Sequence, residues 1–227
     1  MLIVRSAYLR LGAPVAVVLL LLAVAPSRAA TNAGGLSALV GKLQRHYQAT
    51  ASFTAQFNET LISPGAPSRE RSGQVSYRKS GMIRWEFAAP EPETIVADGT
   101  TLFDYDPGLN QVIEMPLKSA FKSHSAAAFI LGVGNLERDF AVTASASTPA
   151  DGLKHLVVTP KDGGDKIELG LDSKTMNIVT LHIVDGLGNS TVLKFAAIRR
   201  NLPIDPSLFK FTPPAGADIV NAGPSAH

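Results

Sequence analysis

Cysteine is absent from all 227 residues of the sequence. This absence excludes a disulfide framework, a cysteine-based metal site and a cysteine nucleophile. The cysteine that must follow a lipoprotein-type leader is missing as well. We therefore expect a protein with neither covalent cross-links nor an acyl anchor.

Residues arranged for catalysis are also scarce. No Gly-x-Ser-x-Gly motif is present, and Gly132-Val133-Gly134 lacks the third glycine of a dinucleotide-binding loop. The acidic residues are mostly isolated, and Glu91 and Glu93 are separated by a proline, so no carboxylate pair indicates acid–base chemistry. We expect no cofactor and no enzymatic activity.

The histidines never show the i, i+4 spacing of a helix-borne metal pair. They are His46, His124, His155, His182 and His227. His155 and His182 lie on predicted strands and could approach each other, but strand histidines without a carboxylate partner are more typical of a core or a surface. No metal site is predicted.

Positive charge is not in excess outside the N-terminal stretch. Residues 1–30 contain three arginines and no acidic residue, so the remainder carries 18 basic and 19 acidic residues. No basic run is present. Nucleic acid is therefore not expected as a partner.

The first thirty residues are typical of a secretory signal peptide. Arg5 and Arg10 precede a Val/Leu/Ala run at 15–24, and Ser27-Arg28-Ala29 offers a small-x-small cleavage site. The apolar run is short for a membrane span, and an uncleaved anchor is the alternative. We expect residues 1–30 to be removed and residues 31–227 to form one domain.

An amphipathic helix is predicted over residues 35–49. Five of its residues recur at helical spacing and form one apolar stripe: Leu36, Leu39, Val40, Leu43 and Tyr47. A helix packed on the core and a movable lid both fit this pattern.

Most of the remaining sequence alternates apolar and polar residues, as half-buried strands do. The alternation is clearest from Gln74 to Tyr105, where Ser80-Gly81 and Asp98-Gly99 are predicted hairpin turns. Further strands are predicted at 52–61, 111–115, 140–143, 153–159, 166–171, 178–184, 191–198 and 209–212. Residues 118–131 favour a second helix and 205–209 a single helical turn. We predict a mainly β (α+β) fold of ten to twelve antiparallel strands, arranged as a barrel or sandwich.

The predicted strands place a large apolar set on one face. Its members are Val75, Tyr77, Ile83, Trp85, Phe87, Phe103, Tyr105, Ile113 and Met115. A solid core is one interpretation of this face. A cavity is the other, because a barrel of this strand number is wide and need not fill with side chains.

Several motifs occur in an order shared with a known family. They are Gln56-Phe57, Tyr77-Arg78-Lys79, Met82-Ile83-Arg84-Trp85-Glu86, Asp98-Gly99-x-x-Leu102-Phe103-x-Tyr105-Asp106-Pro107, Ala128-Phe129-Ile130-Leu131, Leu156-Val157-Val158-Thr159-Pro160 and Phe209-Lys210-Phe211-Thr212-Pro213-Pro214-Ala215-Gly216. Together they cover essentially the whole chain after the leader. The ordered set resembles the periplasmic outer-membrane lipoprotein carrier family, LolA.

The resemblance implies an unclosed antiparallel β-barrel with an α-helical lid over an apolar cavity. It also implies a monomeric periplasmic carrier for acylated lipoproteins. The carrier would accept them from an ATP-driven (ABC transporter) complex of the inner membrane and deliver them to an outer-membrane receptor. That receptor is itself a lipoprotein, so the missing cysteine fits the soluble carrier better.

One position departs from the family pattern. The family has an arginine, usually followed by proline, that reaches the lid helices and helps to hold the empty carrier closed. Lys79, followed by Ser80, occupies that position here and shares parity with Val75 and Tyr77. Lys79 is therefore the predicted lid latch, although lysine lacks the planar fork of arginine and should grip carbonyls less rigidly.

Acyl contacts are assigned to the apolar face, to Phe57 and to two helical pairs. These pairs are Leu39 with Leu43 on the first helix and Phe129 with Ile130 on the second. Two other classes stay open: a periplasmic lipid- or peptide-sensing regulator on the same fold, and an outer-membrane β-barrel. Against the barrel, the sequence lacks a terminal aromatic residue and its two helices have no place in one, while a sensor usually carries a second domain.

Overall fold

The computed structural model describes residues 28–120, 135–147, 149–161 and 163–222. Twelve strands form one sheet in the order β12-β6-β5-β4-β3-β2-β1-β11-β10-β9-β8-β7. Every neighbouring pair is antiparallel except β12 and β6, which run parallel. The edge strands β12 and β7 do not pair with each other within the described residues, so the sheet is unclosed, as the resemblance implies.

The strands follow the predicted alternation closely. Their bounds are β1 (Ser52–Ile62), β2 (Arg69–Arg78), β3 (Met82–Phe87), β4 (Glu93–Asp98), β5 (Thr101–Asp106), β6 (Gln111–Pro116), β7 (Phe140–Ala144), β8 (Lys154–Pro160), β9 (Lys166–Leu171), β10 (Ile178–Val184), β11 (Ser190–Arg200) and β12 (Asp218–Asn221). The turn predicted at Ser80-Gly81 is present, and both residues have positive φ angles, 82° and 77°. Arg78 pairs with Met82, so the loop also includes Lys79 and has three residues.

The helices depart further from the prediction. Helix α1 (Arg28–Gln48) begins well before the predicted start, and α2 (Leu117–Ala120) covers only the first residues of the predicted second helix. The rest of that predicted helix, with Phe129 and Ile130, lies outside the described residues, as does most of the predicted leader. A further short helix, α4 (Leu136–Asp139), precedes β7.

The last predicted strand, 209–212, is wrong. The turn η1 (Pro206–Phe209) forms as predicted, capped by the Asp205 carboxylate, and buries Phe209. Phe211 then stacks against Phe103 at a centroid distance of 5.4 Å. Its ring is held by packing rather than by strand pairing, and the last strand is β12 instead.

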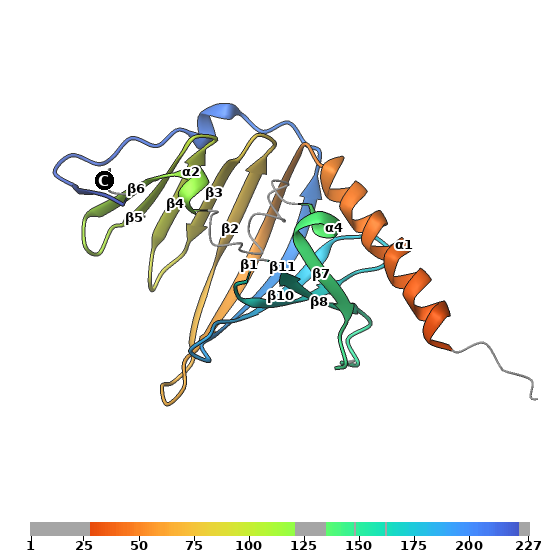
Figure 1. The fold of residues 1–227 in the computed structure, drawn as a ribbon. Helices are drawn as coiled ribbons and strands as arrows, with labels where there is room; N and C mark the ends of the chain where they lie inside the picture. The colour runs from red at the N-terminus through yellow and green to blue at the C-terminus, as the bar shows by residue number, and fades with distance from the viewer. Residues whose placement is uncertain (1–27, 121–134, 148, 162, 223–227) are drawn as a thin grey trace, which may run out of the picture.

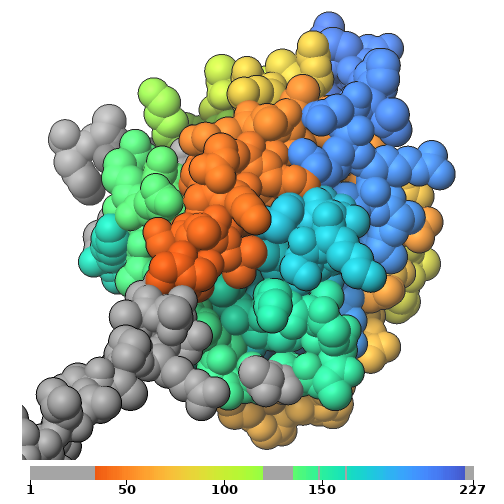
Figure 2. Space-filling model, turned by 90° about the vertical axis from the view of Figure 1, so that its right-hand side faces the viewer, coloured from red at the N-terminus to blue at the C-terminus, as the bar shows by residue number. Residues whose placement is uncertain are grey.

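The larger buried core lies on one face of the sheet, hereafter the inner face, and beneath α1. Val96 and Val112 are fully buried on the opposite face. Figure 1 shows β7, β8 and β10 turning over in front of β1 and β11, with α1 along that end of the sheet. Figure 2 shows α1 (orange) lying against the segments near residue 140 (green) and near residue 175 (cyan). The curvature gives one end of the sheet a closed core and leaves the β4–β6 end less covered.

Candidate binding face on the inner side of the sheet

Strand register defines which side chains share the inner face. Residues paired across neighbouring strands point to the same side of a sheet. Three such rows cross β2 to β6: Gly73-Phe87-Glu93, Val75-Trp85-Ile95-Asp104-Ile113 and Tyr77-Ile83-Ala97-Leu102-Met115.

Seven of the nine residues predicted for this face lie on it. They are Val75, Tyr77, Ile83, Trp85, Phe87, Ile113 and Met115. Phe103 and Tyr105 are the exceptions, and their placement with Trp85 is wrong. The turn after β4 pairs Leu102 with Ala97, which puts the two aromatic rings on the opposite face.

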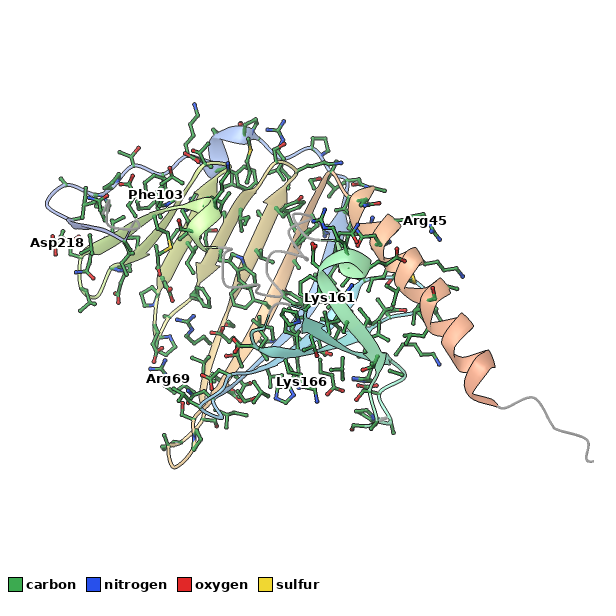
Figure 3. All side chains as sticks on the ribbon, in the orientation of Figure 1. Arg45, Arg69, Phe103, Lys161, Lys166 and Asp218 are labelled. Atoms are coloured by element: carbon green, nitrogen blue, oxygen red, sulfur yellow. The ribbon has the colours of Figure 1, made fainter. Side chains whose placement is uncertain are left out.

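Phe103 and Tyr105 have their own packing partner there. The ring of Phe211 lies 5.4 Å from Phe103 and 6.0 Å from Tyr105. Phe103, a residue of β5, is labelled in Figure 3. Leu102 and Asp104 take the two places on the inner face, so a leucine and a carboxyl group stand where two aromatic residues were predicted.

An aromatic cluster forms the centre of the inner face. The ring of Phe57 on β1 lies 4.7 Å from Trp85 and 5.0 Å from Phe87, both two strands away. It crosses β2 at Gly73, where a Cβ atom would lie 2.8 Å from its Cζ. Phe195 on β11, which the sequence analysis missed, lies 6.2 Å from Trp85 and extends the cluster.

The inner face is closed at one end and half-open at the other. Val75, Tyr77 and Ile83 are only 1–4% exposed, as in a solid core. Five apolar residues towards β6 are only partly buried and are hereafter called the apolar strip: Trp85, Ile95, Leu102, Ile113 and Met115. A solid core therefore describes the part of this face at Val75, Tyr77 and Ile83, and the strip is a partly exposed apolar surface.

A group of charged residues borders the apolar strip at the end of the sheet near Arg69, away from α1 (Figure 3). Arg71 donates hydrogen bonds to Glu59 at 2.8 Å and to Glu93 at 2.5 Å. Its guanidinium carbon lies 3.7 Å from the centre of the Phe87 ring. Burial, and then the neighbouring Glu93 carboxylate, raise the pKa of Asp104 to about 6.

Sequence reasoning did not anticipate this charged group. Arg71 and Glu93 lie 22 residues apart, and only strand pairing brings them together. The sequence does show charged residues at alternate positions of predicted strands. Which of them face inward, and which of them meet, depends on the strand register.

Hydrogen bonds fix the second half of α1 to the rest of the molecule. Gln44 accepts from the backbone N–H of Leu136 at 2.7 Å, and the Tyr47 hydroxyl accepts from that of Ile178 at 3.0 Å. Burial raises the pKa of Tyr47 to about 12. Leu43 is fully buried beneath the helix, and Leu39 is partly buried beside it.

Arg200, at the end of β11, holds the C-terminal end of α1. Its guanidinium donates to the His46 carbonyl at 3.2 Å and to Thr50 Oγ1 at 2.8 Å, and lies 3.1 Å from His46 Nδ1. Burial, and then this positive charge, lower the pKa of His46. Sequence analysis missed Arg200, which lies 154 residues from His46.

Lys79 also contacts α1. Its Nζ donates to the Gln48 carbonyl at 3.2 Å, from an exposed position. A positive charge at this place is attracted by the negative, C-terminal end of the helix dipole. The predicted latch residue therefore does reach the helix, but through one exposed hydrogen bond, whereas Arg200 makes several.

The cavity beneath α1 is small. Its volume is about 30 Å³, enough for about one or two water molecules and too small for an acyl chain. The lining residues are Tyr47, Thr50, Phe53, Ala55, Asn177, Ile178, Phe195, Ile198 and Arg200. In this closed arrangement the available apolar surface is the strip, not the space under the helix.

The described residues contain no cluster of three or more residues suited to a metal ion. His155 Nε2 lies 2.9 Å from Asp151 and its Nδ1 3.3 Å from Glu168, whereas His182 faces Ser190. No helix in the described part of the chain has the length and apolar character needed to cross a membrane.

Fold similarity extends to distant proteins. A crystal structure of an uncharacterized conserved protein from Thermus thermophilus superposes with a TM-score of 0.51 at 14% identity. The match covers 83% of this chain and 98% of that one, and it shows a shared fold only.

Comparison of sequences places the chain in a family. Residues 48–212 match the family model of the outer membrane lipoprotein carrier protein LolA. The outer-membrane lipoprotein carrier protein of Dechloromonas aromatica (strain RCB) is 33% identical over 185 residues, 80% of this chain and 86% of that protein. That of Bordetella pertussis (strain Tohama I) is also 33% identical, over 88% of this chain and 90% of that one. From the family model and these relatives, the chain belongs to the outer membrane lipoprotein carrier family, LolA.

Proposed function

We propose that this protein carries lipoproteins by holding their acyl chains against the apolar strip. The observation that supports this most is the contrast within one face: a closed core beneath α1 and a partly exposed apolar strip beside it. Relatives that share a third of the sequence are named outer-membrane lipoprotein carrier proteins. The chemistry required is binding, not bond making.

The energetics of acyl chains explain why such a carrier needs an apolar face. Each CH₂ group moved out of water is worth about 0.8 kcal/mol, so a ~14-carbon chain in water costs about 11 kcal/mol. A carrier must offset most of this cost and still release its cargo. A partly exposed apolar strip offsets part of this cost and leaves the cargo accessible for release.

Helix α1 is proposed as the lid. Leu43 has no exposed surface in the closed arrangement, so acyl contact with Leu43 requires α1 to move. The hydrogen bonds of Lys79 and Arg200 to the end of the helix would have to break first. Phe129 and Ile130 remain proposed acyl contacts on a segment outside the described residues.

The cellular setting follows from the same proposal. Residues 1–30 would direct export to the periplasm, and residues 31–227 would act there as a single, monomeric domain. The proposed donor is an ATP-driven, lipoprotein-releasing complex of the inner membrane, and the proposed acceptor is an outer-membrane lipoprotein receptor. No catalytic step is proposed.

Replacing one residue of the strip tests the proposal. Met115→Gln places a polar group in the apolar strip and should weaken acyl-probe binding about tenfold, because burying an amide without a partner costs about 1–3 kcal/mol. Binding is read from the fluorescence of Trp85, the only tryptophan. Purification from the periplasm followed by mass spectrometry identifies natural cargo.

Leu109→Gln is the matched control. Leu109 is 70% exposed on the loop between β5 and β6, so this variant should bind acyl probes like the unmodified protein. Equal affinity of the Met115 and Leu109 variants would contradict acyl binding on the strip.

A further inference from the structure

The polar border of the apolar strip is unusually rich in carboxylates. Glu59, Glu93, Asp104 and Asp106 all lie on the inner face, as shown by their pairing with inner-face residues of β11, β3, β4 and β6. Within the described residues, Arg71 is the cation that forms hydrogen bonds with these carboxylates, namely with Glu59 and Glu93. At neutral pH this end of the face therefore carries net negative charge.

Arg71 is not available to bind an anion. Its Nε and one terminal nitrogen are bonded to Glu59 and Glu93, and the face of its guanidinium covers Phe87. Only 15% of its side-chain surface is exposed. Arg69, two residues away and 61% exposed, lies 3.8 Å from Glu91 near the end of β2.

Asp104 lies in the row of the strip that adjoins the other carboxylates. It is paired with Ile95 on β4 and with Ile113 on β6, so apolar residues flank it on both sides. Glu93 forms a hydrogen bond with it and repels its negative charge, and Asp106 adds further repulsion. The positive charge of Arg71 offsets part of this effect. On the inner side, β3 contributes Trp85 and Phe87, which carry no charge.

The edge beyond β6 adds no compensating cation in the described residues. Gln111 is the inner-face neighbour of Asp106, and its amide donates to Asp218 on β12 at 3.3 Å. Glu114, also on β6, is paired with Phe103 and so lies on the opposite face.

We propose that Glu93 and Asp104 make this face selective for acyl chains carried on neutral ester or amide groups and reject amphiphiles with an anionic head. This inference rests on the proposed acyl-binding function. A chain lying on the strip brings its polar end beside Asp104. A phosphate, carboxylate or sulfonate there would lose water next to like charges, whereas an ester or amide would meet no such repulsion.

The selectivity has a functional consequence for a lipoprotein carrier. Membranes offer far more phospholipid than lipoprotein, and both bear acyl chains. Hydrophobic contact alone does not distinguish them, because it depends on the apolar area removed from water. A repulsive group at the polar end of the strip supplies the distinction without adding affinity.

Two probes with the same tetradecyl chain length test the proposal. Tetradecyl sulfonate keeps its negative charge at every pH used, and monotetradecanoylglycerol is neutral. Binding of both to the full chain is measured by Trp85 fluorescence below their micellar concentrations. The ratio of the two dissociation constants, sulfonate over glyceride, is the measure of selectivity.

We expect the ratio to exceed one for the unmodified protein at pH 7.5 and to fall roughly three- to tenfold in Asp104→Asn, the effect of one like charge near a protein surface. Glu114→Gln, which removes a carboxylate from the opposite face, should leave the ratio unchanged. Because Asp104 has a pKa of about 6, the ratio for the unmodified protein should also fall between pH 7.5 and 5. This pH dependence should be absent from Asp104→Asn.

A ratio that is unaffected by Asp104→Asn and also independent of pH would overturn the proposed selectivity, with the carrier function intact. The pH titration needs no variant, so it stands even if a substitution unfolds the protein. Failure of both probes to change Trp85 fluorescence would contradict the acyl-binding strip itself and the selectivity with it.

Discussion

At the scale of single residues, the glycine opposite Phe57 leaves room for the contacts that its ring makes. Gly73 has no side chain, so the Phe57 ring crosses β2 and reaches Trp85 and Phe87 two strands away. A Cβ atom at Gly73 would also lie 2.0 Å from the Glu86 carbonyl oxygen. The absence of a side chain at Gly73 thus allows Phe57, in the closed core, to contact Trp85 in the half-open strip.

Asp104 is the residue whose ionisation should alter stability most clearly. Its pKa of about 6 in the folded protein lies above the ordinary aspartate value of 3.8, so the folded state binds the proton more tightly. The ionised carboxyl therefore lowers stability at pH 7.5. That cost fades as the pH falls through about 6 and is gone near pH 4.

We expect Asp104→Asn to be more stable than the unmodified protein at pH 7.5, by about 1 kcal/mol after allowing for partial exposure. Near pH 4 the two proteins should differ little. Urea unfolding at both pH values measures the free energies. Equal stability at pH 7.5 would contradict the raised pKa.

At the scale of elements, α1 is held more firmly at its C-terminal end than a freely moving lid would be. Hydrogen bonds connect this part of α1 to three segments distant in sequence, at Leu136, Ile178 and Arg200. Lys79 adds one exposed bond to Gln48. The arginine fork that position 79 lacks is present at the same end of the helix, on β11.

Replacing Arg200 and Lys79 separately distinguishes their contributions. Arg200→Leu should speed amide hydrogen exchange over residues 40–48 about tenfold or more, because it removes several charge-assisted hydrogen bonds. Lys79→Leu should change exchange little and keep the fold, yet impair lipoprotein transfer. Exchange is followed by mass spectrometry and transfer by a release assay.

Arg200→Lys is the conservative control and should restore part of the protection. Equal exchange in the Leu variants of positions 200 and 79 would contradict the larger contribution of Arg200. Transfer at the unmodified rate in Lys79→Leu would contradict its role as a latch.

At the scale of the whole molecule, the sheet has two edges to protect. Strand β7, at one edge, is contacted by α4, which directly precedes it, and by α1. At the other edge, the chain passes through η1 and returns to pair β12 in parallel with β6. Unpaired backbone groups on a long edge strand invite association with other chains, so β12 protects β6.

Truncation after Ala217 should therefore cause self-association. Removing β12 leaves the β6 edge without its four pairing residues. Size-exclusion chromatography with light scattering should show dimers or larger species for the truncated chain. Ile219→Lys with Val220→Lys keeps the strand while removing exposed apolar side chains, and this control should remain monomeric.

Local sequence was enough to predict most of the elements. Period-two alternation predicted the strands from Ser52 to Arg200, and the turn at Ser80-Gly81 followed from its glycine, which accepts positive φ without strain. The amphipathic stripe of α1 and the ordered motifs of the family were visible in the same way. These features depend on neighbours in sequence, so the sequence alone determined them.

Tertiary structure decided what the elements place together. The pairing of Trp85 with Ile95 and of Ile95 with Asp104 places Asp104 in the strip and leaves Phe103 and Tyr105 on the opposite face. Strand pairing joined Arg71 to Glu93, and the end of β11 placed Arg200 beneath α1. These contacts depend on register between distant segments, and a shift of one residue would reverse each face.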